Sequence, residues 1–235
     1  ELSWKYNVKR LLFLGSSCIY PKFSKQPIKE DSLLQGELEP TNEFYALAKI
    51  AGIKLCESLR KQHSFDSICL MPCNLYGIGD NYHKDDSHVI PALIRKISEA
   101  KEKNLKEITC WGSGNPLREF LYVDDLANAC IYVLNNWYPS ENLSKEKNID
   151  NLPWLNVGSN EEISIKDLAL RISKIVGFNG KIYWDESKPD GTPRKKLDTT
   201  RLNKLGWFPK MNLDHGLELT YEDYKNSLIN NTLRK

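Results

Sequence analysis

The sequence predicts an α/β fold built around a parallel sheet. Apolar runs of strand length alternate with segments of helical periodicity, as at 10–15, 43–62 and 65–71, and this alternation is typical of parallel strands joined by crossover helices. The chain has 235 residues, of which 40% are hydrophobic, so it is long enough to bury the core of one or two domains.

The elements of the first half follow from the spacing of apolar residues. The segment Glu39-Pro40-Thr41-Asn42 is a helix-start signal and places the beginning of the longest helix. The predicted elements, in chain order, are the end of a helix over 1–7, a buried strand over 10–15, a polar loop over 20–39, a helix over 43–62, a strand over 65–71, a turn over 72–77 and a helix over 87–101.

The second half continues the alternation. Asp124 and Asp125 open one of its helices, because acidic side chains favour a helix N-terminus. The predicted elements are strands over 107–111 and 119–122, a helix over 123–135, a polar surface insertion over 136–152, a strand over 154–157, a helix over 165–176, a strand over 181–184, a charged Pro/Gly loop over 186–196 and a closing helix over 213–228.

Composition narrows the class of protein. The 33 basic and 31 acidic side chains leave a net charge of only +2, which gives no reason to expect binding to nucleic acid or to an anionic membrane. The apolar runs are too short for a membrane-spanning helix. None of the six cysteines are spaced as Cys-x-x-Cys, so we expect a reduced, cytoplasmic protein without a metal site.

Two short segments carry the most chemical information. Ser16 and Ser17 follow the first predicted strand, so they lie at its carboxyl end, where open α/β sheets bind ligands. Tyr45 and Lys49 are four residues apart in the next helix and therefore project from the same face. An ammonium group favours the phenolate, so this pair is suited to proton donation. Separately, a strand-end serine is usually a cap and a Tyr/Lys pair a solvated face; together they favour catalysis.

This combination resembles the Ser/Tyr-x-x-x-Lys centre of the short-chain dehydrogenase/reductase superfamily, in its extended, nucleotide-sugar branch. Over nearly the whole chain the resemblance is closer, to the GDP-L-fucose synthase family, the 3,5-epimerase/4-reductases of GDP-4-keto-6-deoxy-mannose. The segments that carry it are 13–22 (FLGSSCIYPK), 38–58 (LEPTNEFYALAKIAGIKLCES), 74–77 (NLYG), 87–93 (SHVIPAL), 111–125 (WGSGNPLREFLYVDD) and 188–198 (KPDGTPRKKLD).

The resemblance implies a fold, a cofactor and partners. The fold is a partial Rossmann-type parallel sheet with a smaller α/β substrate-binding lobe. The cofactor is NADP(H), the substrate is a GDP-sugar, and the complete protein is a homodimer paired through helices such as 43–62.

For the reduction, the resemblance implies that Tyr45 is the general acid that protonates the C4 oxygen. Lys49 supports Tyr45 and also binds the nicotinamide ribose, and Ser16 hydrogen-bonds the ketone oxygen. The residues alone do not choose between Ser16 and Ser17.

For the epimerisation, Cys18 and His88 are the implied catalytic pair. Inversion at C3 and C5 beside a ketone needs a base on one face and an acid on the other, and both thiol and imidazole exchange protons near neutral pH. Taken singly, a buried cysteine is usually packing and a histidine usually a satisfied polar residue.

Binding residues are implied as well. Those on the cofactor are Ser16, Tyr45, Lys49, Asn74, Leu75 and His88, and those on the substrate are Lys96, Trp111, Arg118 and Asp190. The two cations suit a diphosphate, and tryptophan offers a flat apolar wall. Lys96 stands where relatives carry arginine. Without the resemblance, these four residues would be a solvated lysine, a core tryptophan, a surface arginine and a turn aspartate.

The resemblance also predicts boundaries. Residues 1–80, with 119–160 returning to them, form the partial dinucleotide-binding domain, and 81–118 with 161–235 form the substrate-binding lobe. A dinucleotide-binding sheet opens with a strand and a Gly-x-x-Gly-x-x-Gly turn, but the one glycine cluster, 112–116, lacks the helix that must follow. We therefore expect the amino-terminal third of a family member to be absent, and this segment alone to be inactive.

Two alternative interpretations stay open. A nucleotide-sugar 4-epimerase or 4,6-dehydratase also carries the Tyr/Lys pair, although a dehydratase usually has acidic residues where this chain has Cys18-Ile19-Tyr20. A non-catalytic binding module would keep the fold, but the intact set of candidate catalytic residues disfavours it.

Overall fold

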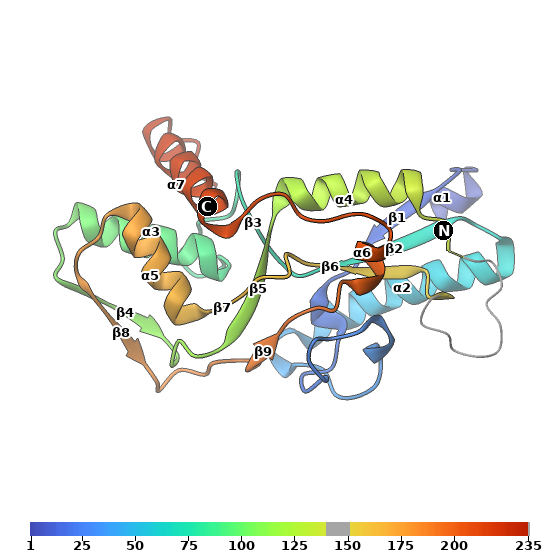
Figure 1. Ribbon diagram of the computed structural model, residues 1–235, viewed down its shortest axis with the longest axis horizontal. Helices are drawn as coiled ribbons and strands as arrows, with labels where there is room; N and C mark the ends of the chain where they lie inside the picture. Colours follow the sequence, from blue (N-terminus) through green and yellow to red (C-terminus); the bar gives the residue numbers. More distant parts are fainter. Residues whose placement is uncertain (140–150, 235) are drawn as a thin grey trace.

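The predicted alternation of strands and helices is confirmed in the computed structural model, which describes residues 1–139 and 151–234 (Figure 1). The helices are α1 (Leu2–Lys5), α2 (Glu43–His63), α3 (Val89–Glu102), α4 (Val123–Asn136), α5 (Ile165–Val176), α6 (Thr200–Lys204) and α7 (Leu213–Ile229), and the strands are β1 (Leu11–Leu14), β2 (Ser67–Pro72), β3 (Asn74–Tyr76), β4 (Glu107–Trp111), β5 (Leu117–Tyr122), β6 (Trp154–Val157), β7 (Glu162–Ser164), β8 (Lys181–Asp185) and β9 (Arg194–Lys195). Most of the predicted insertion over 136–152 lies outside the described residues.

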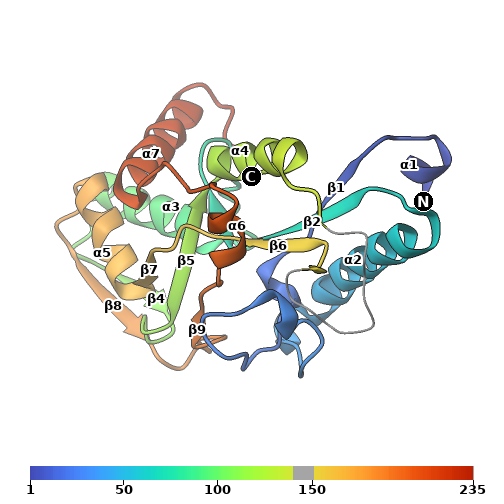
Figure 2. The same ribbon diagram turned by 45° about the vertical axis from the view of Figure 1, so that its right-hand side comes forward.

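A parallel sheet of the order β1-β2-β6 forms one half of the molecule. Helices α2 and α4 lie on opposite sides of it in both views (Figures 1 and 2). The central strand β2 is buried at every position. The strand predicted over 10–15 is confirmed as β1, but its predicted burial is wrong: β1 is the edge of this sheet, its first three residues are only half-buried, and Leu14 is 39% exposed.

The second half contains a sheet of the order β3-β5-β7 with β9 also paired to β5, and a separate parallel pair, β4 and β8. Helices α3, α5 and α7 gather at this end (Figure 1). The turn predicted over 72–77 is wrong in part, because Asn74–Tyr76 pairs with β5 as strand β3. Strand β7 runs antiparallel to β5. The sequence does not predict β7, β9 or α6, since elements this short show no periodicity.

Each half has its own hydrophobic core. In the first, Ile53 of α2 and Ile68 of β2 are fully buried, and in the second, Ile97 of α3 and Leu168 of α5 are. The chain returns to the first core at Leu197, Leu202 of α6 and Trp207. The predicted domain boundaries stay a prediction.

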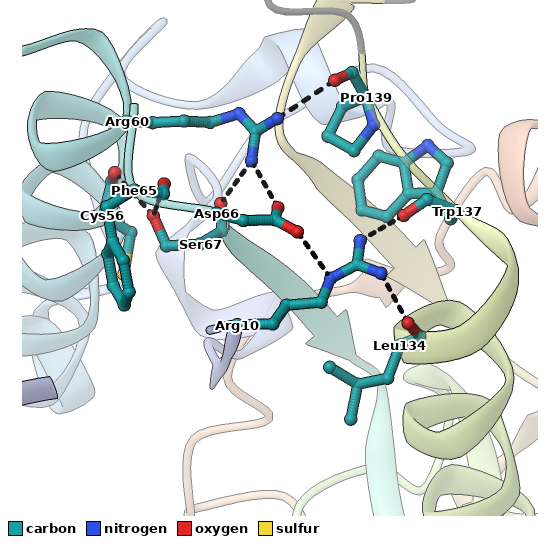
Figure 3. A network of polar contacts seen from close by, with 9 residues as sticks. All are labelled: Arg10, Cys56, Arg60, Phe65, Asp66, Ser67, Leu134, Trp137 and Pro139. Carbon is teal, nitrogen blue, oxygen red and sulfur yellow. Dashed lines mark hydrogen bonds and ion pairs between the residues drawn. The ribbon is translucent and has the colours of Figure 1, made fainter. Parts of the chain in front are cut away.

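A polar network lies at the amino-terminal ends of strands β1 and β2 (Figure 3). Asp66 forms ion pairs with Arg10 Nε at 3.0 Å and with Arg60 NH1 at 2.8 Å. Arg10 also donates to the carbonyls of Leu134 and Trp137, at the end of α4. These contacts tie α4 to the starts of β1 and β2, at the end of the strands opposite the site described next.

Candidate active site

A cavity of about 660 Å³ opens where β1 and β2 end against the first turns of α2 and α3. Seven residues predicted from the sequence lie in its lining: Ser16, Cys18, Tyr45, Lys49, Asn74, Leu75 and His88. They come from four separate segments of the chain, which the parallel sheet brings to one edge. The structure therefore collects in a single site every residue that was predicted to be catalytic or cofactor-binding.

The end of β1 places the serines. Gly15 packs so closely on β2 that an added Cβ would lie 2.3 Å from the sulfur of Met71, so a larger residue there would push the strand end away. Ser16 then begins a short 3₁₀ turn, and its Oγ accepts a hydrogen bond from the Cys18 amide at 3.2 Å. Ser16 is half-buried, whereas Ser17 is only 3% exposed.

The first turns of α2 place the tyrosine and the lysine. Lys49 Nζ donates to the Leu14 carbonyl at 2.9 Å and lies 5.6 Å from the centre of the Tyr45 ring. Tyr45 is 49% exposed. The ammonium group is therefore fixed between the phenol ring and the strand end that leads into Ser16, so it supplies positive charge next to the two groups expected to hold a ketone.

Strand β3 and the start of α3 close the other side of the cavity. Asn74 Nδ2 donates to the Glu119 carbonyl at 2.9 Å, which fixes the amide against β5. His88 is the N-cap residue of α3 and is exposed, and its side chain makes no capping hydrogen bond. The imidazole is thus presented at the rim of the cavity rather than used to stabilise the helix.

Cys18 has a cationic neighbour that sequence reasoning missed. Lys195 Nζ donates to Cys18 Sγ at 3.2 Å, across 177 residues of sequence. Arg118 lies beside this pair, because Arg118 of β5 and Lys195 of β9 are register partners. Burial lowers the pKa of Arg118, while Asp190 and Cys18 act in the opposite direction. The sequence did contain a signal for this residue, because Lys195 belongs to the segment 188–198 that carries the family resemblance. Only Asp190 of that segment was predicted as a site residue.

A second cavity, of about 230 Å³, adjoins the first, and Asn74 and Val89 line both. Three of the four predicted substrate-binding residues lie in its lining: Trp111, Arg118 and Asp190. Trp111 is 74% exposed, and Lys188 Nζ lies 5.8 Å from the centre of its ring. An exposed indole beside a half-buried guanidinium is suited to a flat base joined to an anionic group.

Asp190 closes a loop over this second cavity. Its carboxylate accepts hydrogen bonds from the amide and the hydroxyl of Ser113, each at 2.7 Å. These bonds from Ser113 hold the pKa of Asp190 below its usual range. Gly112 has φ +80°, and an added Cβ would lie 2.4 Å from Asp190 Oδ1, so glycine is required both for the turn and for the close approach of the loop.

Lys96 is the one predicted site residue that lies outside the lining of both cavities. Its ammonium donates to the Thr109 carbonyl in β4. Its proposed contact with substrate stays a prediction.

The described residues contain no helix with the length and apolar character needed to cross a membrane. Nor do they contain a group of three or more His, Cys, Asp or Glu side chains arranged to hold a metal.

The arrangement defines a class of protein. The model of the NAD dependent epimerase/dehydratase family matches residues 1–143, and the chain belongs to that family. Among curated proteins it is similar to GDP-L-fucose synthase of Escherichia coli K12, with 53% identity over 92% of this chain and 66% of the relative. It is also similar to GDP-L-fucose synthase 1 of Arabidopsis thaliana, with 51% identity over 97% of this chain and 67% of the relative. The chain thus spans about two thirds of the length of these relatives.

Among solved structures, a GDP-mannoheptose C4 reductase from Campylobacter jejuni with NADP bound has a TM-score of 0.80 and 33% identity. The match covers 95% of this chain and 72% of that one. The predicted fold class, a Rossmann-like α/β fold with a parallel sheet, is confirmed.

Proposed function

We propose that the complete protein converts GDP-4-keto-6-deoxy-D-mannose to GDP-L-fucose by 3,5-epimerisation and NADPH-dependent reduction of the C4 ketone. The observation that carries this proposal is the joint placement of Ser16, Cys18, Tyr45, Lys49 and His88 around one cavity. The similarity to the two GDP-L-fucose synthases and to the C. jejuni reductase with NADP bound supports the proposal.

The cavity residues fit the nicotinamide end of NADP. The cavity offers an ammonium group from Lys49, a hydroxyl from Ser16 and a carboxamide from Asn74, next to the apolar side chain of Leu75. When bound there, NADPH would supply a hydride for the ketone carbon. Lys49, Asn74 and Leu75 would hold the nicotinamide and its ribose.

In the reduction, Tyr45 gives its phenol proton to the C4 oxygen as the carbon is reduced. Ser16 hydrogen-bonds that oxygen, and the ammonium of Lys49 stabilises the phenolate that remains. The tether from Lys49 to the Leu14 carbonyl keeps the charge at this position between turnovers.

In the epimerisation, Cys18 and His88 act on opposite faces of the sugar. One group removes the proton from the carbon next to the ketone, the C–H electron pair moves to the ketone oxygen, and the other group returns a proton to the opposite face of the carbon. Both side chains line the same cavity from different segments, which supports their assignment as a pair.

The nucleotide end of the substrate belongs to the second cavity. Arg118 binds the diphosphate, Trp111 lies against the base, and Asp190 holds the loop that covers them. In this scheme residues 81–118 and 161–235 act as the substrate-binding lobe, and 1–80 with 119–160 as the cofactor-binding part.

A homodimer and a cytoplasmic location complete the proposal. The outer face of α2 carries Phe44, Leu47 and Leu55, which are 86%, 48% and 43% exposed, and a second copy of the chain would cover this stripe. We expect Leu47→Glu to convert the complete protein from dimer to monomer in sedimentation velocity, whereas Lys174→Glu, at an exposed position on α5, leaves it dimeric. All six cysteines are free thiols, which is typical of proteins in a reducing compartment.

The experiment that tests the activity supplies the complete protein with GDP-4-keto-6-deoxy-D-mannose and NADPH in heavy water. We expect GDP-L-fucose that carries deuterium at C3 and C5, with matching consumption of NADPH. A reduced product that keeps both original hydrogens would exclude the epimerase half. Conversion of a nucleotide-sugar that is not a ketone, without net consumption of NADPH, would instead identify a 4-epimerase or a dehydratase.

A further inference from the structure

Cys18 and Lys195 form a thiol–ammonium pair that the scheme above does not use. The Nζ–Sγ distance is 3.2 Å, and both residues are half-buried. They also line a small pocket, which shares Ser17 and Asn42 with the lining of the larger cavity. The contact is therefore partly sheltered from solvent. This matters because a fully exposed ion pair would be weak.

The structure fixes Lys195 rigidly from both flanks. Before it, Arg194 forms two hydrogen bonds with Glu162, at 2.7 and 2.8 Å. After it, the amide of Leu197 donates to the fully buried Glu119 at 3.1 Å. Strand β9 pairs with β5 in between. The backbone of Lys195 is thus anchored on both sides, and its long side chain reaches the sulfur from a fixed position.

Cationic side chains gather around the sulfur of Cys18. Lys195 and Arg118 lie next to it from β9 and β5, and Asp190 of the adjoining cavity acts on Arg118. Lys22 lines the same small pocket but is paired with Glu39 at 3.1 Å, so these two charges offset one another. The remaining titratable groups of the two linings are Lys49, Tyr45, His88 and Cys73 in the larger cavity and Tyr20 in the small pocket. Cationic groups therefore outnumber carboxylates among the described residues around this sulfur.

We propose that Lys195 is a positioning residue that holds the sulfur of Cys18 by a hydrogen bond, directs it toward the substrate and supplies the positive charge beside it when it acts as a base. This inference rests on the proposed function, and it assigns Cys18 the role of base. The thiolate accepts the proton from the carbon beside the ketone, and the C–H electron pair becomes the enolate. Lys195 donates a hydrogen bond throughout and transfers no proton itself. An acid on the opposite face then protonates the carbon.

The test measures the rate at which iodoacetamide alkylates Cys18 as a function of pH, with mass mapping to separate this thiol from the other five. Only a thiolate reacts. We expect Lys195→Met to slow alkylation about tenfold near neutral pH, since a neighbouring cation favours the charged form of the reacting group. Lys195→Arg should restore most of the rate, and Lys196→Met should match the wild type.

A Lys195→Met protein with a native circular dichroism spectrum and an unchanged alkylation profile would overturn the inference. If that variant does not fold, Lys195→Gln, which is also uncharged and can still donate a hydrogen bond, tests the same contact with the same expected loss of rate. The proposed function fails separately: if the wild type neither exchanges protons nor reduces the ketone while alkylation still depends on Lys195, the pair stands and the reaction is wrong.

Discussion

The two parts of the site to which we assign reduction and epimerisation are built differently. The contact of the reduction centre joins Lys49 to Leu14, only 35 residues away in the chain. The contact that supports the epimerising thiol joins Cys18 to Lys195, across 177 residues, and the loop over the substrate cavity joins Ser113 to Asp190, across 77. The first centre depends on one strand and the helix that follows, whereas the second depends on the assembly of the whole molecule.

This difference suggests that the two halves can be damaged independently. A change in the phenol should affect only the reduction. Changes around the sulfur or in the covering loop should leave the local tyrosine–lysine geometry intact.

The largest effect is expected for Tyr45→Phe. Loss of the phenol proton should lower the rate of C4 reduction by about 10²–10⁴-fold, while deuterium exchange at C3 and C5 continues. NADPH consumption and mass spectrometry of the recovered ketone measure the two steps. Tyr183→Phe is a suitable control, because Tyr183 is also about half exposed, at 47%, but lies in β8. Equal loss of both activities would show that the two halves are not separable.

Removal of the epimerising groups should have the opposite pattern. We expect Cys18→Ser and His88→Asn each to lower deuterium exchange by about 10²-fold or more, with reduction of an already epimerised ketone largely retained. The readout is exchange in heavy water without NADPH. A variant at either position that exchanges at the normal rate would remove that residue from the mechanism.

A smaller effect is expected for the loop contact. Asp190→Asn removes the charge that strengthens two hydrogen bonds from Ser113, and we expect the substrate KM to rise about fivefold, equivalent to about 1 kcal/mol, with little change in kcat. Ser113→Ala should act similarly, and the double variant should be no worse than either single one. Additive effects would show that the two residues act separately.

The same contact predicts a pH dependence. Because the pKa of Asp190 in the folded protein lies below its usual range, the contact is present at every pH above the ordinary range of aspartate. It is lost only as the pH falls through the lowered value. Limited proteolysis of the loop 186–193 should therefore stay slow until strongly acidic pH, and Asp190→Asn should remove this protection at neutral pH.

The smallest effect on chemistry is expected at the amino-terminal ends of β1 and β2, away from the cavity. Asp66→Ala breaks the ion pairs with Arg10 and Arg60 and should lower the free energy of unfolding by about 1–3 kcal/mol without changing kcat or KM. Urea denaturation measures the loss. A large fall in kcat at unchanged fold would mean that the two edges of the sheet are coupled.

Sequence by itself determined the local features of this protein. The pattern of apolar residues predicted β4, β6 and α5 at the bounds observed. A half-buried element such as β4 or α5 requires apolar residues at its own repeat, and a fully buried strand such as β6 requires a short, mainly apolar run. The four-residue spacing of Tyr45 and Lys49 likewise determined their common face. These features depend on neighbours in the sequence, so they are visible without the fold.

Only the tertiary structure decided the rest. Strands β3, β7 and β9 exist because β5 offers them hydrogen-bond partners, and β1 is partly exposed because it lies at the edge of its sheet. The same pairing of β9 with β5 places Lys195 beside Cys18. A contact across 177 residues leaves no spacing signal, since its geometry is set by the packing of elements that the local sequence does not relate to one another.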